Sequence, residues 1–213
     1  MRDLERFVAD LASCDIGRTF NLFRDEMPDY DAKGGAARRR SNLLHYLDSR
    51  VRAEVVAVGE APSFRGMRWS GIAFTSERTL DSWGAPYRRS SLRPEGWTEP
   101  SATIVHRVLA DLGAEERVLL WNSVPTHPHR PDDPLSNRRP SAAEIEAGGA
   151  FARRLLELVQ PPSVVAIGRV AESILRSILG TDVPYVRHPA NAGAVEFADG
   201  MRALLDRALR QGR

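Results

Sequence analysis

Three polar residues, Glu60, Asn122 and His188, each stand just beyond an apolar, β-branched run of the sequence. A carboxylate can position or activate water, a carboxamide offers a hydrogen-bond donor and an acceptor, and an imidazole can stabilise developing negative charge. Taken singly, each residue could equally serve as a turn, a helix cap or an ion-pair partner. Together, an acid, an amide and an imidazole at strand ends predict one cleft.

The apolar runs predict four strands, separated by segments with helical periodicity. The strands are expected over Glu54–Val58, Arg117–Trp121, Ser163–Ile167 and Val183–Val186. Helices are expected over residues 101–113, 141–159, 168–180 and 193–210, and the second begins with the capping box Ser141-x-x-Glu144. Alternating strands and helices predict a three-layer α/β/α sandwich with a central four-stranded parallel sheet. Ligands of such sheets bind beyond the carboxyl ends of the strands.

The length and hydrophobic content of the chain are sufficient for one hydrophobic core. The chain has 213 residues, of which 42% are hydrophobic, and shows no repeat or linker. We expect a single domain over residues 1–213, with an N-terminal helical region at 1–50 and an α/β core at 51–213. The first residues read as an amphipathic helix without a secretory signal, and no apolar run is long enough for a membrane span, so a cytoplasmic location is expected. A monomer is also expected. The single cysteine, Cys14, excludes an internal disulfide, an iron–sulfur cluster and a cysteine-rich zinc site.

Positive charge is carried almost entirely by arginine. Lys33 is the only lysine among 30 cationic residues. Arginine suits bidentate phosphate recognition, although an arginine-biased genome explains the composition equally well. Two segments, 25–40 and 81–100, are expected to be irregular. The second carries arginines among aromatic residues and could hold a nucleic-acid strand. The alternative is a loop folded on itself by its own aromatic side chains.

Three longer motifs resemble those of the uracil-DNA glycosylase superfamily, and their sequences are most similar to those of its family 4 branch. They are "GEAPSFRGMRWSGIAF", "LLWNSVPTHPH…NRRPSAAEIEAG" and "VRHPAN", and the resemblance runs from about Glu54 to Asn191. It implies an enzyme without metal or cofactor that flips a damaged or modified base, above all uracil, out of DNA. The enzyme would then hydrolyse the N-glycosidic bond and leave an abasic site.

The resemblance also implies a role for each site residue. Phe74 would stack on the flipped base, Asn122 would read its polar edge and His188 would stabilise the departing anion. Glu60 would position or activate the water. The base pocket would further include Gly59, Ala61 and Ser63. DNA contacts are expected from Arg65, Arg68, Arg138, Arg139, Arg187 and Asn191, with Arg38–Arg40, Arg88 and Arg89 further along the rim.

Several departures from the family pattern keep the substrate open. Gly148 stands where family 4 carries a cluster cysteine, and Ala61 and Ser63 replace the Asp and Tyr of family 1. A small Ser63 leaves room for a 5-substituted pyrimidine. Ala192 replaces the wedge leucine, so Asn191 or the 81–100 segment would fill the vacated stack.

Other functions remain possible. Excision of hypoxanthine or of a phage-type 5-substituted pyrimidine is one alternative, and a non-catalytic binder of modified bases is another. A nucleotide-binding Rossmann-like enzyme is disfavoured because no Gly-x-Gly-x-x-Gly follows the first strand. His127-Pro-His129 offers too few ligands for a metal and is read as a phosphate-facing turn.

Overall fold

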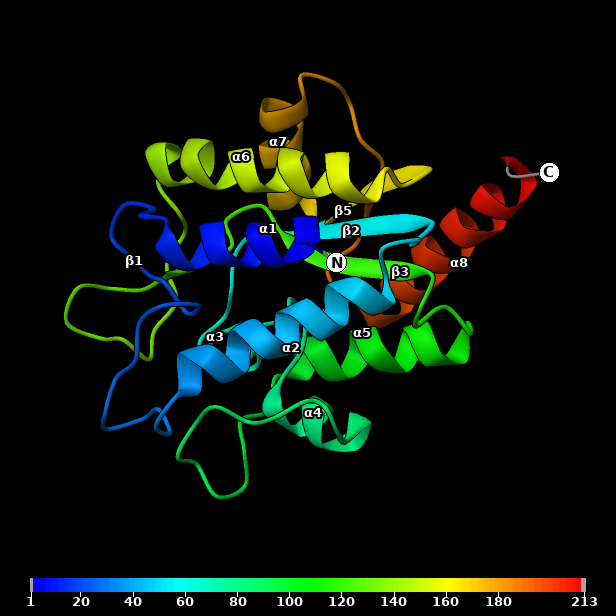
Figure 1. Ribbon diagram of the computed structural model, residues 1–213. Helices are drawn as coiled ribbons and strands as arrows, with labels where there is room; N and C mark the ends of the chain where they lie inside the picture. The colour runs from blue at the N-terminus through cyan, green and yellow to red at the C-terminus, as the bar shows by residue number, and fades with distance from the viewer. Residues whose placement is uncertain (1, 212–213) are drawn as a thin grey trace.

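A four-stranded parallel sheet forms the centre of the protein, which was analysed as a computed structural model that describes residues 2–211 (Figure 1). Its strands are β2 (Val55–Gly59), β3 (Val118–Asn122), β5 (Ser163–Ile167) and β6 (Tyr185–Val186), in the spatial order β3-β2-β5-β6. Every residue of β2 and β3 is buried. Such continuous apolar strands are typical of a parallel sheet covered on both faces.

Helices cover both faces of this sheet, which confirms the predicted three-layer architecture (Figure 1). They are α1 (Arg2–Ser13), α2 (Gly35–Ser49), α3 (Met67–Ser70), α4 (Glu77–Trp83), α5 (Pro100–Asp111), α6 (Ala142–Val159), α7 (Arg169–Leu179) and α8 (Ala194–Gln211). Helices α6 and α7 lie on one side of the sheet, and α2 and α5 lie on the other. Two short strands, β1 (Thr19–Phe20) and β4 (His127–Pro128), pair outside it. Among the described helices, none combines the length and apolarity that a membrane span requires.

The predicted capping box is present at the start of α6. The Ser141 hydroxyl accepts a hydrogen bond from the Glu144 backbone amide at 3.3 Å, and the Glu144 carboxylate accepts one from the Ser141 amide at 2.8 Å. This exchange satisfies two amides that the first helical turn would leave unpaired.

The two segments predicted to be irregular differ from that prediction in part. Helix α2 begins at Gly35, so Arg38–Arg40 lie on a helix and not in a loop. Helix α4 occupies the start of the second segment, and residues 84–99 contain no helix. Trp83 stacks on Tyr46 with ring centroids 6.3 Å apart, and Trp97 stacks on Trp69 at 5.4 Å. The aromatic side chains therefore fasten this segment to the body of the protein.

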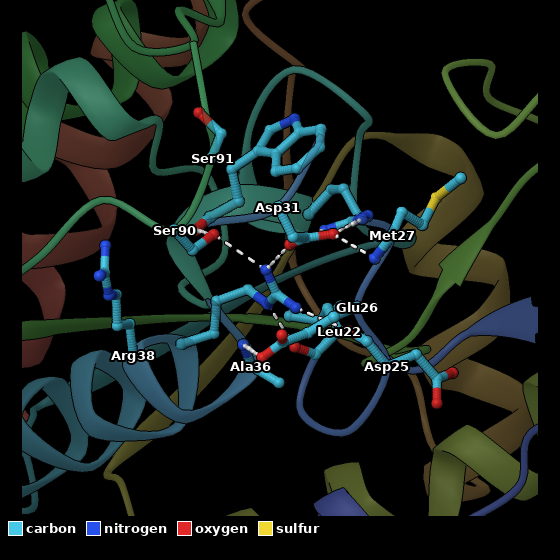
Figure 2. Close-up of polar contacts among 12 residues, drawn as sticks. Leu22, Asp25, Glu26, Met27, Asp31, Ala36, Arg38, Ser90 and Ser91 are labelled. Carbon is cyan, nitrogen blue, oxygen red and sulfur yellow. Dashed lines mark hydrogen bonds and ion pairs between the residues drawn. The ribbon is translucent and has the colours of Figure 1, made fainter. Parts of the chain in front are cut away.

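A buried charge cluster joins the N-terminal region to α3. The side chains of Asp31, Arg39 and Arg68 are almost inaccessible to solvent. Arg39 pairs with one carboxylate oxygen of Asp31, and Arg68 donates to the same oxygen at 3.3 Å and to the other at 2.8 Å. The Met27 backbone amide donates to Asp31 at 2.8 Å, and Ser90 Oγ accepts from Arg39 at 2.9 Å (Figure 2). The cluster thus joins residues 27–39 to α3 and to the segment around Ser90.

A second buried carboxylate balances this cluster. Glu77 is fully buried and accepts hydrogen bonds from the Ser90 and Ser91 amides, each at 2.8 Å, and from the Trp97 amide at 3.1 Å. Its charge acts favourably on Arg68. Two buried guanidinium groups therefore face two buried carboxylates, and each carboxylate is further hydrogen-bonded, as a buried ion requires.

The cluster corrects part of the predicted DNA rim. Arg68 and Arg39 are buried in ion pairs and cannot reach a phosphate. The Arg38 guanidinium donates to the Arg89 carbonyl, and Arg40 donates to the Phe23 carbonyl. Arg89 itself pairs with Asp81. These arginines bind the protein's own carbonyl and carboxylate groups, a use that charge patterning in the sequence cannot distinguish from phosphate binding.

We expect Asp31→Asn to destabilise the fold severely. The substitution keeps the size of the side chain but leaves Arg39 and Arg68 buried without their counter-ion. Removing one partner from a buried ion pair costs about 3–5 kcal/mol of unfolding free energy. Urea denaturation measures the loss. Asp29→Asn, at a solvent-exposed position in the same segment, is the matched control, and equal unfolding free energies for the two variants would contradict the structural role of the cluster.

Candidate active site

A cleft of about 810 Å³ lies where the carboxyl ends of the strands meet. Most residues that the sequence singled out line it, namely Glu60, Ala61, Ser63, Phe74, Asn122, Arg138, Arg139, Arg187, His188 and Asn191. The sheet order explains this convergence. Asn122 ends β3, Glu60 follows β2, and His188 follows β6, so their side chains come from three strands of one parallel sheet.

Gly59 allows the aromatic ring and the amide of the site to approach each other. It pairs directly with Asn122 across β2 and β3. A Cβ atom at Gly59 would lie 2.6 Å from both the Asn122 Oδ1 atom and the Phe74 ring. Any larger residue would push these two side chains out of place. The backbone of Phe74 has φ of 50°, a left-handed conformation that is uncommon outside glycine and typical of functional sites.

Asn122 is buried with its amide group only weakly engaged. Its side chain donates to the Met67 Sδ atom at 3.2 Å, and a thioether is a poor acceptor. Only 3% of Asn122 is exposed to solvent. A ligand that offers an oxygen to this amide would therefore gain a better hydrogen bond than the one it replaces.

His188 is arranged as a neutral hydrogen-bond donor. Its Nδ1 atom accepts from the Ala190 amide at 3.1 Å, so the proton of the neutral ring resides on Nε2. Burial, and then the charge of Arg187, lower the pKa of His188 below its ordinary value. The ring lies 5.9 Å from that of Phe74, with a tilt of 46°. Gly168 makes room for it, since a Cβ there would lie 3.2 Å from the His188 Cβ atom.

Glu60 is the carboxylate of the cleft that is influenced by the positive charge of Arg139. Burial raises its pKa, and the charge of Arg139 acts in the opposite direction. Among residues 2–207, whose side chains the structure describes, no group donates a hydrogen bond to this carboxylate. A half-buried carboxylate with free lone pairs can accept a proton from a water molecule in the cleft.

Several residues that line the cleft were missed by the sequence analysis, and three of them bear on its chemistry. Glu99, Met67 and Asn137 all face the cleft. Asn137 accepts a hydrogen bond from the Phe64 amide at 2.9 Å and fastens the loop after Glu60. Glu99 had a signal in the sequence, because it precedes Pro100 at the start of a helix that leads into β3. A helix running back to a parallel strand begins at the carboxyl edge of the sheet.

Several expected contacts lie elsewhere or are already engaged. Arg65 is exposed beside the cleft without lining it, and Arg88 is also exposed. Arg138 lines the cleft but pairs with Glu144 at 2.7 Å. His127 is fully buried and hydrogen-bonded to the Ser136 carbonyl, so the expected phosphate-facing turn is wrong for this residue. In the described part of the chain, no three acidic, histidine or cysteine side chains gather as a metal site requires.

Comparison with known proteins identifies a matching family and similar solved structures. The family model described as Uracil DNA glycosylase superfamily matches residues 47–209. Among solved structures, wild-type SMUG2 from Pedobacter heparinus is similar, with a TM-score of 0.72 and 15% sequence identity. The similarity covers 99% of this chain and 97% of that chain, and at this identity it bears on the fold alone. No curated protein sequence matches the chain.

We expect His188 to titrate below its ordinary pKa and to carry its neutral proton on Nε2. Arg187→Gln removes one of the two causes, so the pKa of His188 should rise toward the ordinary value and stay below it because burial remains. NMR titration of the imidazole nitrogens measures both the pKa and the tautomer. Arg107→Gln, at an exposed position on α5, is the matched control. An Nδ1–H tautomer, or identical titrations in the two variants, would contradict this arrangement.

Proposed function

The chain belongs to the uracil DNA glycosylase superfamily, and on that basis we propose that it excises uracil from DNA. The reaction is hydrolysis of the N-glycosidic bond, which releases the base and leaves an abasic site. The observation that carries this proposal is the convergence of the Phe74 ring, the Asn122 amide and the Nε2–H donor of His188 on one cleft.

Each of the three groups suits one part of a flipped base. A base inside a duplex must leave the stack before an enzyme can reach its glycosidic bond. The face of Phe74 offers a stacking surface for the extruded ring. The Asn122 amide, one donor and one acceptor, complements the carbonyl and N–H on the edge of uracil and mismatches the edge of cytosine.

The departing base carries the negative charge that the site must stabilise. As the bond between the base nitrogen and C1′ breaks, its electron pair moves to the base and charge accumulates on the C2 carbonyl oxygen. His188 donates its Nε2–H to this oxygen. A neutral donor forms this bond without taking up a proton beforehand, and the low pKa of His188 keeps it neutral at physiological pH.

Glu60 completes the reaction on the sugar side. A water molecule held by its carboxylate attacks C1′, and the carboxylate accepts the proton that the water loses. The released base anion then takes a proton from solvent. Glu60 must be ionised for this step, and the nearby Arg139 favours that form against the effect of burial.

We further propose that the enzyme is monofunctional. Cleavage of the abasic strand by a glycosylase of the lyase type requires an amine nucleophile that forms a Schiff base. Lys33 is the only lysine of the chain and is absent from the cleft lining. An abasic site is therefore the expected product.

We expect substitutions of the base-binding residues to impair different steps of the reaction. Asn122→Asp should weaken uracil excision, because an ionised carboxylate cannot donate to the base. Phe74→Ala should weaken capture of the flipped base by roughly 1–3 kcal/mol. Single-turnover release of uracil from an oligonucleotide, at several enzyme concentrations, separates binding from chemistry.

Substitutions of the two groups assigned to the chemical step complete this test. His188→Ala should slow excision by on the order of 10²–10³-fold, the loss expected for one transition-state donor, with a small loss of binding. Glu60→Gln should lower the rate while the cleft keeps its shape. His45→Ala, at an exposed position on α2, is the matched control. Wild-type rates for both His188→Ala and Asn122→Asp would show that the cleft is not the active site.

We expect DNA affinity to depend on salt through a small set of free arginines. Among residues 2–211, no carboxylate lies within ion-pair distance of Arg65, Arg139 or Arg187. Three neutralised phosphates give a slope of log K against log salt of about −2.7, or about 40-fold weaker binding between 50 and 200 mM salt. Equilibrium binding of an abasic-analogue duplex measures this slope.

Arg139→Gln should flatten this slope by about 0.9. Arg68→Gln offers no valid control because it disturbs the buried cluster, whereas Arg107→Gln alters an exposed arginine outside the cleft lining. An affinity that barely changes between the two salt concentrations would show that the arginine rim is misassigned.

A further inference from the structure

Phe74 carries the stacking surface of the cleft on an unfavourable backbone, and the mechanism proposed above does not explain what holds it there. With φ of 50°, Phe74 lies in the left-handed region, which a bulky residue adopts only where its surroundings impose it. Rotation about φ turns the side chain relative to the chain on either side. Relaxation to an ordinary φ would therefore move the ring out of its place beside Gly59 and His188.

Two buried hydroxyl groups fasten the backbone around Phe74. The Thr75 Oγ1 atom donates to the Ala73 carbonyl at 3.0 Å, and the Ser70 Oγ atom donates to the Thr75 carbonyl at 2.7 Å. The first of these bonds joins the residue before Phe74 to the residue after it. Ser70 and Thr75 are fully buried, so solvent does not compete for the bonds.

His106, on α5, binds the first of these hydroxyl groups. Its Nε2 atom lies 3.0 Å from the Thr75 Oγ1 atom. A hydroxyl group has one hydrogen, and that of Thr75 is directed at the Ala73 carbonyl, so His106 is the donor and carries its proton on Nε2. Burial and the charge of Arg50 lower the pKa of His106 to about 4, and a backbone interaction with Phe74 acts in the opposite direction. The ring is therefore neutral at physiological pH.

Aromatic contacts fix the direction in which His106 donates. The Trp83 ring stands nearly perpendicular to the imidazole, at 87°, with ring centroids 5.2 Å apart. Trp83 stacks in turn on Tyr46, whose hydroxyl accepts a hydrogen bond from the Leu120 amide of β3 at 2.8 Å. The imidazole is thus anchored to the same strand that ends in Asn122.

The function of His106 follows from these contacts. Among the described residues, it is not one of those that line the cleft, so it does not contact the base. We propose that His106 is a positioning residue: by donating to the Thr75 hydroxyl, it holds Phe74 in the left-handed conformation and keeps the stacking ring in place for the flipped base. This inference rests on the proposed function of the cleft. Loss of the imidazole donor should weaken capture of the base and leave binding of the DNA backbone unchanged.

The test compares two duplexes that differ only at the target nucleotide. One carries an arabino-configured 2′-fluoro-2′-deoxyuridine, which resists hydrolysis because the fluorine disfavours positive charge on C1′. The other carries a tetrahydrofuran abasic analogue, which offers no base to stack. The measured quantity is the base-capture ratio, defined as the affinity for the fluorinated duplex divided by that for the abasic duplex. Phe74→Ala should lower this ratio by about 5–150-fold, the loss of one stacking contact.

Substitutions of His106 and Thr75 test the hydrogen bond itself. His106→Met should lower the base-capture ratio by at least about 5-fold, the lower limit for that contact. His106→Gln gives a side chain of nearly the same length and shape but with an amide donor, so it should retain most of the wild-type ratio. Thr75→Val should act as His106→Met does, whereas Thr75→Ser, which keeps the hydroxyl, should retain the ratio. His45→Met makes the same change at an exposed position on α2 and should behave as the wild type.

A double-mutant cycle separates positioning from general stability. In the Phe74→Ala background, His106→Met should change the base-capture ratio no further, because the ring through which His106 acts is absent. A residue that only stabilises the fold would lower the affinity for both duplexes alike and leave the ratio unchanged. Thermal denaturation shows whether His106→Met is folded, and if it is not, Thr75→Val takes its place in the cycle.

The outcomes distinguish this inference from the proposed function. A wild-type ratio in His106→Met and in Thr75→Val, equal ratios in His106→Met and His106→Gln, or an undiminished effect of His106→Met in the Phe74→Ala background would overturn the role of His106 and leave the proposed function standing. Failure of the wild type to release uracil from an ordinary uracil-containing duplex would overturn the proposed function, and this inference with it.

Discussion

The candidate site depends on the close pairing of β2 with β3 at Gly59. The parallel register places Gly59 beside Asn122, and the missing side chain leaves the space in which Asn122 and Phe74 meet. Hydrogen bonds continue past the strands, from the Ser123 amide to the Gly59 carbonyl and from the Val124 amide to the Glu60 carbonyl. The backbone carrying the acid is therefore held by the backbone carrying the amide. A buried sheet thus fixes the geometry on which a preorganised site depends.

The loop beyond Glu60 needs separate support, because it leaves the sheet. The buried cluster provides it. Asp31 binds Arg68 on α3, next to Met67, and Met67 contacts the Asn122 amide. The Arg68 guanidinium also lies over the rings of Phe20 and Trp69, at 3.8 and 4.0 Å from their centroids. A change in the N-terminal region can therefore reach the base-binding amide through only a few buried contacts.

The sequence predicted the sheet and the strand-end residues well because both leave strong local signals. Continuous buried strands read as apolar runs, and their carboxyl ends must share an edge of a parallel sheet. The roles of the arginines were not predictable in this way. Whether Arg68 meets a phosphate or Asp31 depends on a contact between residues 37 positions apart. Glu99 was missed for a similar reason, since the loop that brings it against Gly66 has no periodic pattern.

The cluster also gives a physical reason for arginine at two of its positions. Burial lowers the pKa of Arg39 to about 10, and it lowers that of Arg68 as well. A guanidinium starts from a pKa above 12 and so remains charged at neutral pH after such a loss. A lysine side chain starts from a pKa of about 10.4, and a similar loss would bring its pKa to within about one unit of neutral pH. An ammonium there would begin to lose its charge about one pH unit above neutral, whereas the guanidinium keeps its charge with a wide margin. The planar guanidinium also presents several donors at once, so Arg39 binds Asp31, Ser90 and two backbone carbonyls. At these two positions, the need for a permanent, multiply bonded buried charge is sufficient to explain arginine without any contact to DNA.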